Sequence, residues 1–302
     1  MATTTLERLR GADFLDIAEL EPEELRALLE LARRIKSGEW TQTPLAGRHV
    51  AMLFQKPSLR TRVSFEVGVD RLGGRAVVLG EEEIRLGHRE TAADVARVLD
   101  RYVDGIVARV NRHQDLVDMA AAARAPVINA LTDASHPCQV IADLVTIEEA
   151  LGRLDSSTRV AFVGDGNNVV ASLMEAATLL GFPLTVVSPP AYRPSAESIA
   201  GARQVVVTGD LSAVEGAAVV YTDVWTSMGQ EAEREARNAQ FAEYQVDARL
   251  MELAPGAIFM HCLPAHRGEE VSAEVIDGPR SVVFDQAGNR LYAQMALMAA
   301  VF

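Results

Sequence analysis

The stretch HVAMLFQKPSLRTRVSFEVGVDRLGGRAVVL, residues 49–79, decides the fold. It begins with an apolar run at 49–54, continues through a segment at 59–72 with an apolar face at helical spacing, and ends with a second apolar run at 75–79. A short apolar strand, a helix and another strand in this order are typical of a parallel βαβ unit. We therefore expect a parallel sheet with helices packed on it.

The same alternation continues along the chain and starts again near residue 158. Two such series predict an α/β fold with two lobes, each a mostly parallel sheet flanked by helices. The further strands are expected at 105–110, 126–131, 158–164, 183–188, 204–209, 217–223 and 257–262, with 281–285 as an additional candidate. The further helices are expected at 91–102, 114–124, 168–180 and 286–302.

The segment HPCQVIADLVTIEEALGRL, residues 136–154, lies between the two series and is predicted to be one long helix. A helical joint, rather than a Gly/Pro linker, suggests two lobes with a cleft that opens and closes. In parallel sheets the ligands bind beyond the carboxyl ends of the strands. The loops that follow strands are therefore the places to look for the active site.

The composition narrows the class of protein. The 302 residues are 49% hydrophobic and 24% charged, which is typical of a globular protein. The formal net charge of −13 argues against a nucleic acid or an anionic membrane as partner. Two cysteines, Cys138 and Cys262, exclude a disulfide scaffold and a four-thiolate zinc site. We expect a cytoplasmic protein, since no apolar run is long enough to span a membrane.

The loop FQKPSLRTR, residues 54–62, offers a site for an anion. Ser58 is placed to cap the following helix, and Arg60 and Thr61 lie in its first turn. A helix N-terminus, hydroxyl groups and an arginine together bind phosphate well. The alternative is an ordinary capped helix with solvated arginines.

Four further positions, three in the N-terminal series and one in the last helix, suggest polar recognition. Arg109 closes an apolar strand, where a guanidinium is costly to bury without an anion. His136 and Gln139 are three residues apart and face the same way on a first helical turn, where they can donate to a carbonyl oxygen. Arg290 opens the last predicted helix. Structural or solvated roles remain open for each of them alone.

The loop VGDGNN, residues 163–168, is similar to a dinucleotide-binding fingerprint but lacks its third glycine, since Val169 stands there. We therefore expect no nucleotide cofactor. Asn167 and Asn168, at a strand end, are instead suited to hold a polar small molecule.

Two loops in the second series carry groups suited to an amine. In DVWTSMG, residues 223–229, Asp223 is placed to hold an ammonium group. In HCLPAHRG, residues 261–268, Cys262 lies at a strand end. We expect no metal there, because no second Cys or acidic set has the spacing of a zinc site.

Taken in order, these loops resemble the motifs of the transcarbamylase family over essentially the whole chain. SLRTR resembles the family's carbamoyl-phosphate motif, and HPCQ followed by ADLVTIEE resembles the second motif. DVWTSMG, HCLPAHRGEEV and the terminal FDQ…NR…AQ resemble the motifs of its ornithine-using members. The resemblance implies transfer of the carbamoyl group of carbamoyl phosphate to the δ-amine of L-ornithine in arginine metabolism, with no cofactor.

The resemblance also implies the domains and the residue roles. The carbamoyl-phosphate domain would span 1–148, the ornithine domain 149–285, and the helix 286–302 would pack back on the first. Ser58, Leu59 through its backbone, Arg60 and Thr61 would hold phosphate, and Arg109 would bridge phosphate and carbamoyl oxygen. His136 and Gln139 would bind the carbamoyl group. The ornithine site would use Asn168, Asp223, Ser227 and Met228, and the reacting centre Cys262, Leu263 and Arg290.

Two departures from the family pattern bear on substrate and assembly. Leu59 stands where the family usually has Thr, and PSLRTR also occurs in relatives that use N-acylated ornithine. Carbamoyl transfer to a related amine such as N-acetylornithine or putrescine is therefore the alternative function. Arg85 stands where the family often has Gln or His. The resemblance implies a homotrimer or a multiple of trimers, in which this position reaches into the neighbouring subunit's site.

Overall fold

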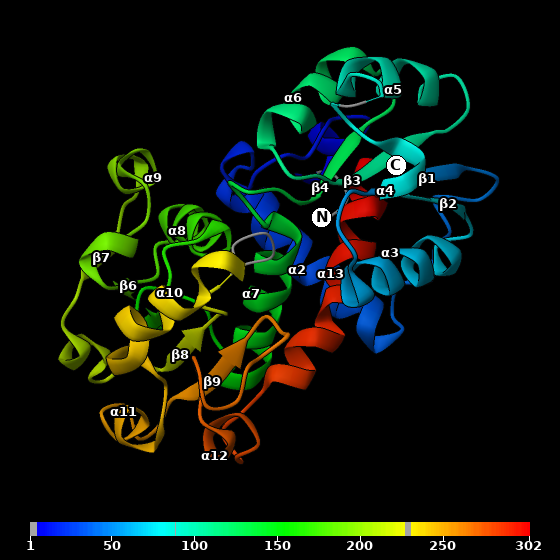
Figure 1. Cartoon of the computed structure of the whole chain (residues 1–302). Helices are drawn as coiled ribbons and strands as arrows, with labels where there is room; N and C mark the ends of the chain where they lie inside the picture. Colours follow the sequence, from blue (N-terminus) through cyan, green and yellow to red (C-terminus); the bar gives the residue numbers. More distant parts are fainter. Residues whose placement is uncertain (1–4, 88, 227–230) are drawn as a thin grey trace. The chain divides into compact units, whose positions relative to one another are not determined.

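The computed structural model describes residues 5–87, 89–226 and 231–302. The chain divides into two compact units, Met1–Val145 with Gly288–Phe302, and Thr146–Ala287. Figure 1 shows the elements of both units coloured along the chain. Helices α7 (Pro137–Leu151) and α13 (Val283–Val301) each contain residues of both units.

The first unit contains a four-stranded parallel sheet in the order β2-β1-β3-β4. The strands are β1 (His49–Phe54), β2 (Arg75–Gly80), β3 (Gly105–Arg109) and β4 (Val127–Leu131). The helices of this unit are α2 (Pro22–Ser37), α3 (Leu59–Arg71), α4 (Glu81–Ile84), α5 (Ala92–Leu99) and α6 (His113–Ala122), with 3-10 turns at Glu7–Leu9 and Ile17–Glu19. Strand β3 is buried along its whole length. The central strands therefore form the core, as the continuous apolar runs predicted.

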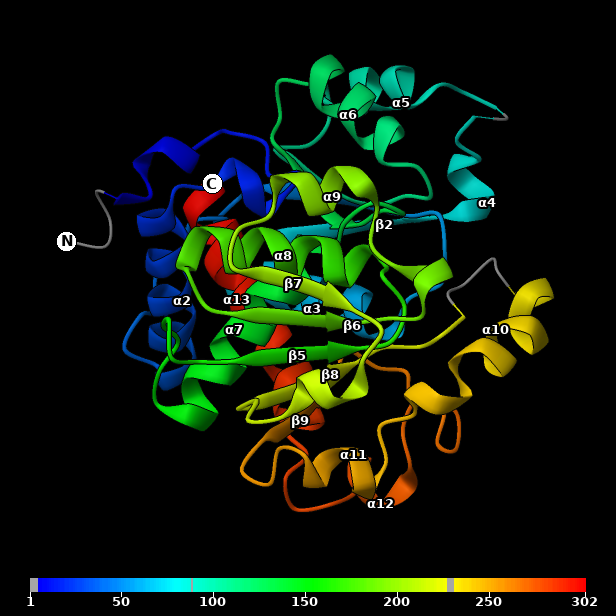
Figure 2. The same ribbon diagram turned by 90° about the vertical axis from the view of Figure 1, so that its left-hand side faces the viewer.

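The second unit contains a five-stranded parallel sheet in the order β7-β6-β5-β8-β9, whose strands lie side by side in Figure 2. They are β5 (Val160–Val163), β6 (Leu184–Val187), β7 (Val205–Thr208), β8 (Val219–Thr222) and β9 (Ile258–His261). The helices are α8 (Asn168–Leu180), α9 (Ala196–Gly201), α10 (Arg234–Phe241), α11 (Ala248–Glu252) and α12 (Ala273–Ile276). The 3-10 turns lie at Pro190–Tyr192, Leu211–Val214, Glu231–Glu233 and Ala242–Tyr244.

Most predicted elements are confirmed, and the boundaries of β1 and α8 agree with the expected ranges. The strand expected at 281–285 is wrong, because α13 begins at Val283. Ser281 makes only an isolated bridge to Phe259. Val283 and Gln286 are buried whereas Phe284 is exposed, so the burial follows a helical period that the run of β-branched residues concealed.

Helix α2 was not among the predicted elements, although its sequence carries the signals of a helix. Pro22 occupies the first turn, Glu21 and Glu24 form a capping box, and Gly38 ends the helix in a left-handed conformation. Its buried residues recur at helical spacing: Leu25, Leu28, Leu29, Ala32 and Ile35. Among the residues that the structure describes, no helix has the length and hydropathy that crossing a lipid bilayer requires.

The loop after β5 is pressed against the segment that follows β6. The amide of Gly166 donates to the carbonyl oxygen of Tyr192 at 2.8 Å. A Cβ added at Gly166 would lie 2.2 Å from the backbone nitrogen of Pro194 and 2.5 Å from the carbonyl carbon of Arg193. Only glycine fits there, because backbone atoms cannot turn aside as a side-chain end can.

We expect Gly166→Ala to lower the free energy of unfolding by about 1–3 kcal/mol, the usual cost of overpacking. Gly201→Ala is the matched control, because a Cβ there meets nothing within 4 Å. The control should be neutral or stabilising, since alanine favours a helix over glycine. Urea unfolding of both variants measures the effect; equal stabilities would mean that the 192–194 segment yields freely.

Candidate active site

The carboxyl ends of β1, β3 and β4 bring a cluster of arginines and hydroxyl groups together in the first unit. Arg109, the last residue of β3, donates through Nη1 to Ser58 Oγ at 3.2 Å and to Thr61 Oγ1 at 3.3 Å. Arg290, on α13, donates through Nη2 to the same Thr61 hydroxyl at 2.5 Å. Residues from three separate parts of the chain thus converge on the first turn of α3.

This cluster is buried. Thr61 is fully buried, and Arg109 and Arg290 keep only 7% and 3% of their surface exposed. Two positive guanidinium groups on one hydroxyl repel each other in a poorly hydrated environment. An anion bound beside them would reduce that repulsion, and a phosphate has the geometry that guanidinium groups recognise.

Ser58 holds the expected place before α3, but it does not cap the helix in the expected way. Its backbone is extended and its side chain makes no capping hydrogen bond. Its Oγ instead accepts the hydrogen bond from Arg109. The capping prediction for its side chain is therefore wrong, because a buried guanidinium competes for the same oxygen.

Leu59 and Arg60 lie next to this cluster in the sequence but do not join it through their side chains. Leu59 is 75% exposed. Arg60 is half-buried, and its guanidinium makes no hydrogen bond or ion pair with the residues that the structure describes. Both roles therefore stay predictions.

His136 precedes α7 and is buried to 5% exposure. Burial, followed by the positive charges of Arg290 and Arg109, holds the pKa of His136 well below its ordinary value of 6.5. The ring is therefore neutral near neutral pH, and it lies within the field of both arginines. A neutral imidazole can donate a hydrogen bond to a carbonyl oxygen without adding a third positive charge.

Gln139 lies one turn further along α7 and is also buried. Its Nε2 donates to Asp143 Oδ1 at 2.8 Å, which fixes the direction of the amide. Its Oε1 is buried and accepts no hydrogen bond from the described residues. A buried acceptor of this kind is suited to a ligand N–H group.

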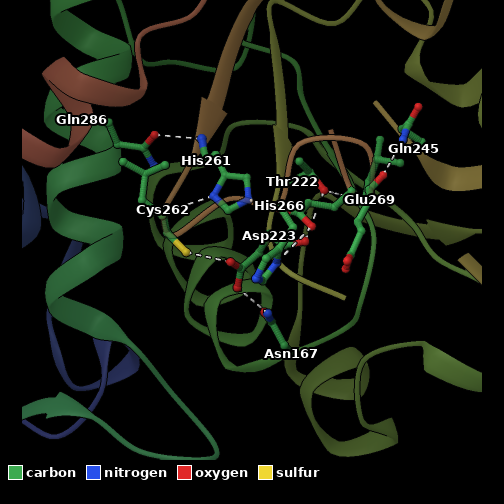
Figure 3. A network of polar contacts seen from close by, with 12 residues as sticks. Asn167, Thr222, Asp223, Gln245, His261, Cys262, His266, Glu269 and Gln286 are labelled. Atoms are coloured by element: carbon green, nitrogen blue, oxygen red, sulfur yellow. Dashed lines mark hydrogen bonds and ion pairs between the residues drawn. The ribbon is translucent and has the colours of Figure 1, made fainter. Parts of the chain in front are cut away.

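In the second unit a carboxylate, a thiol and an amide meet beyond the ends of β8, β9 and β5 (Figure 3). Asp223 is buried to 6% exposure. Its Oδ1 accepts a hydrogen bond from Cys262 Sγ at 2.8 Å, and its Oδ2 accepts one from Asn167 Nδ2 at 2.6 Å. Because these strands are neighbours in a parallel sheet, the three side chains emerge at one edge.

Asn167 rather than Asn168 makes the contact with Asp223. The Oδ1 of Asn167 also accepts from the amides of Val169 and Val170, so this residue caps α8 while its Nδ2 faces Asp223. An asparagine immediately before an apolar helix is a common cap, and this signal could have assigned the role to Asn167. Asn168 is the first helical residue and is half-buried.

Four residues predicted to belong to the site remain to be located. Ser227 and Met228 lie outside the described residues. Leu263 is half-buried, has φ of 58°, and donates its amide to His261 Nδ1 at 2.8 Å. Arg85 ends α4 in a left-handed conformation with its side chain exposed.

Among the described residues of this unit, two groups of side chains offer potential metal ligands. The potential ligand atoms of Asp223, His261 and Cys262 lie within 4.8 Å of one another, and a second group contains His266, Glu269 and Glu270. Both ring nitrogens of His261 already have partners, Glu270 and the Leu263 amide. His261 therefore serves the protein interior rather than an ion.

The arginine-rich cluster of the first unit is suited to an anion such as phosphate. The carboxylate beside a thiol in the second unit is suited to an amine. Residues 12–149 match the family model of the aspartate/ornithine carbamoyltransferase carbamoyl-P binding domain, and residues 156–301 match that of its Asp/Orn binding domain. The chain belongs to the aspartate/ornithine carbamoyltransferase family.

Similar proteins include ornithine carbamoyltransferases from bacteria and archaea. The one from Symbiobacterium thermophilum is 50% identical over 97% of this chain and 98% of its own length. The one from Thermococcus kodakarensis is 50% identical over 97% of both chains. The solved structure of ornithine carbamoyltransferase from Pyrococcus furiosus is 49% identical, with a TM-score of 0.93 and 97% coverage of both chains.

The lowered pKa of His136 predicts a pH dependence of stability. The unfolded chain takes up a proton near the ordinary pKa of 6.5, whereas the folded chain does so only at much lower pH. Stability should therefore fall as the pH drops below 6.5, by at most about 1.4 kcal/mol per pH unit from this residue. Above that pH it contributes no pH dependence.

Urea unfolding of the wild type and of His136→Gln, between about pH 7.5 and about pH 5.5, isolates this contribution. We expect the wild type to lose more stability over this range than the variant does. Parallel pH profiles would mean that His136 has the same pKa in the folded and the unfolded chain.

Proposed function

We propose that this chain is an ornithine carbamoyltransferase, which converts carbamoyl phosphate and L-ornithine into L-citrulline and phosphate in arginine metabolism. The observation that carries the proposal is the buried carboxylate of Asp223, held between the Cys262 thiol and the Asn167 amide. Such a carboxylate is suited to an amino-acid ammonium group. The ornithine carbamoyltransferases at about half identity over nearly the full chain support the same substrate.

The cluster of the first unit would bind carbamoyl phosphate. Arg109, Arg290 and the hydroxyl of Thr61 would hold the phosphate, with Ser58 and Arg60 beside them. The same guanidinium groups would stabilise the charge that develops on the leaving phosphate. They are held in place before the substrate arrives, so little reorganisation is needed during the reaction.

His136 and Gln139 would recognise the carbamoyl group. The neutral ring of His136 would donate to the carbonyl oxygen and polarise it for attack. The unpaired Oε1 of Gln139 would accept from the carbamoyl NH₂ group. An acceptor and a donor side by side distinguish a carbamoyl group from an acetyl group, which has no N–H.

The groups of the second unit would bind the amine substrate. Asp223, with Asn168, Ser227 and Met228, would hold the amino-acid end of ornithine. Cys262 and Leu263, with Arg290, would lie at the reacting centre. An alkyl ammonium has a pKa of about 10.4, so at neutral pH fewer than about one amine in a thousand is free base, a cost of about 4–5 kcal/mol. Binding must therefore favour the neutral nucleophile.

A panel of amines with carbamoyl phosphate tests the proposed substrate. We expect product formation with L-ornithine, and a kcat/KM at least about tenfold lower with N-acetylornithine and with putrescine, because each lacks one charge of the amino-acid end. Colorimetric detection of the ureido product measures all three. A higher kcat/KM with either analogue would replace ornithine by that amine.

We further propose that the protein forms a trimer or a multiple of trimers and works in the cytoplasm. Exposed valines on α3 and on the edge strand β2 support an interface with a second copy: Val63, Val67 and Val77 are 49%, 36% and 40% exposed. Val63 and Val67 line a cavity of about 560 Å³, which is also lined by Glu66, Asp70 and Arg75. The two cysteines are both free, which suits a reducing compartment.

In such a ring Arg85 would complete the phosphate site of the neighbouring subunit. Its side chain is exposed at the end of α4, where it is accessible to another subunit. A site would then take Arg60 from one chain and Arg85 from the next, across a heterologous interface.

Subunit mixing tests this arrangement. Arg60→Ala and Arg85→Ala should each be strongly impaired alone. Refolded together in equal amounts, the two variants should leave about one site in four with both arginines, so activity should recover towards about a quarter of the wild-type value. Activity equal to the average of the parents, with subunit exchange confirmed, would show that Arg85 acts within its own chain.

A further inference from the structure

A fully buried pair, His261 and Glu270, lies behind the proposed amine site and was not among the residues predicted from the sequence. Both side chains have no exposed surface. His261 Nε2 lies 3.0 Å from Glu270 Oε1 (Figure 3 shows the surrounding network). Burying a carboxylate is costly unless it is hydrogen-bonded, so the hydrogen bonds to Glu270 must offset this cost.

The contacts determine which ring nitrogen of His261 carries the proton. The amide of Leu263 donates to Nδ1 at 2.8 Å, so Nδ1 must present its lone pair. The proton is therefore on Nε2, and it is donated to Glu270. Burial alone would raise the pKa of Glu270, but the hydrogen bonds from His261 and from the His266 amide lower it, so Glu270 is a carboxylate.

The pair closes the loop that carries Cys262. Glu270 Oε1 also accepts from the amide of His266 at 2.6 Å, so one carboxylate oxygen holds both ends of residues 261–266. The His261 amide in turn donates to Gln286 Oε1 at 2.9 Å. His261 is thus fixed through its backbone and through both ring nitrogens.

Leu263 is the residue on which this arrangement acts most directly. Its φ of 58° lies in the left-handed region, which a leucine adopts only where its surroundings enforce it. The hydrogen bond from its amide to His261 is such a constraint. Because a peptide unit is planar, fixing the Leu263 amide also fixes the direction of the Cys262 carbonyl group.

We propose that His261, oriented by Glu270, is a positioning residue that holds Cys262 and Leu263 in place for the amine substrate. Cys262 lies between the fixed backbone of His261 and the fixed amide of Leu263, and its thiol reaches Asp223 from there. The amine would therefore meet a thiol and a carboxylate whose separation is set from behind. This inference rests on the proposed function for its substrate.

Two substitutions separate the positioning contact from the stabilising one. The amide of His261→Asn places an oxygen where Nδ1 was, so it keeps an acceptor for Leu263 but loses the contact with Glu270. The longer His261→Gln keeps a donor for Glu270 but loses the acceptor for Leu263. A buried carboxylate that loses its hydrogen bond from residue 261 costs more than an unpaired amide at half-buried Leu263, even though the His266 amide still donates to Glu270.

The two variants are therefore expected to rank in opposite orders for stability and for their effect on ornithine binding. Thermal unfolding should rank the wild type first, His261→Gln second and His261→Asn third. The KM for ornithine should instead rise about tenfold in His261→Gln and only a few-fold in His261→Asn. The KM for carbamoyl phosphate should stay within about twofold in both, because its residues lie in the other unit. Kinetics that follow the stability order would overturn the proposal.

Alkylation of Cys262 by iodoacetamide gives a readout that does not depend on turnover. Cys138 is buried and its pKa is raised to about 12, so it should not react at neutral pH. We expect Cys262 to react several-fold faster in His261→Gln than in the wild type or His261→Asn, because its thiol is no longer held against Asp223. Equal rates in the three proteins would also overturn the proposal.

The same experiments distinguish a failure of the inference from a failure of the proposed function. If the wild type forms no citrulline, the proposed function fails, while the order of the alkylation rates still tests the positioning of Cys262. If the wild type is active and neither the KM for ornithine nor the alkylation rate depends on residue 261, the inference alone fails.

Discussion

The parallel pairing of the strands is the constraint on which the candidate residues of each unit depend. In a parallel ladder all the strands end at the same edge, so residues far apart in the sequence meet there without any further device. In the first unit this brings Arg109 beside the turn that follows β1. In the second it brings Asp223, Cys262 and Asn167 into contact.

Burial then gives each half its own chemistry. In the first unit it concentrates positive charge around a hydroxyl and keeps His136 neutral, so the cluster is ready for an anion. In the second unit it places the Asp223 carboxylate between two neutral donors, the Cys262 thiol and the Asn167 amide. Such a carboxylate suits an amine. The net charge of −13 has little bearing on either, because local groups in a poorly hydrated site outweigh the distant surface charge.

Contacts behind the site matter as much as those that face a substrate. Asn167 caps α8 and holds Asp223 with the same side chain, so a helix terminus and a binding group share one residue. Gly166 allows this loop to lie against residues 193–194. The hydrogen bonds between His261, Glu270 and the His266 amide fix the loop that carries Cys262. Each device uses contacts inside the protein to fix a loop that carries candidate site residues.

The sequence by itself determined the alternation of strands and helices and the two α/β halves, and it supplied the candidates for the site, because apolar periodicity and motif spacing are local properties. It failed at 281–285, where a β-branched run hides a helix, and at Ser58, whose hydroxyl is taken by Arg109. Only the tertiary structure decided that Asn167 contacts Asp223, that Thr61 joins two arginines, and that His261 pairs with Glu270. These contacts join residues between 9 and 229 positions apart, and no local pattern encodes which distant groups a buried polar atom will find.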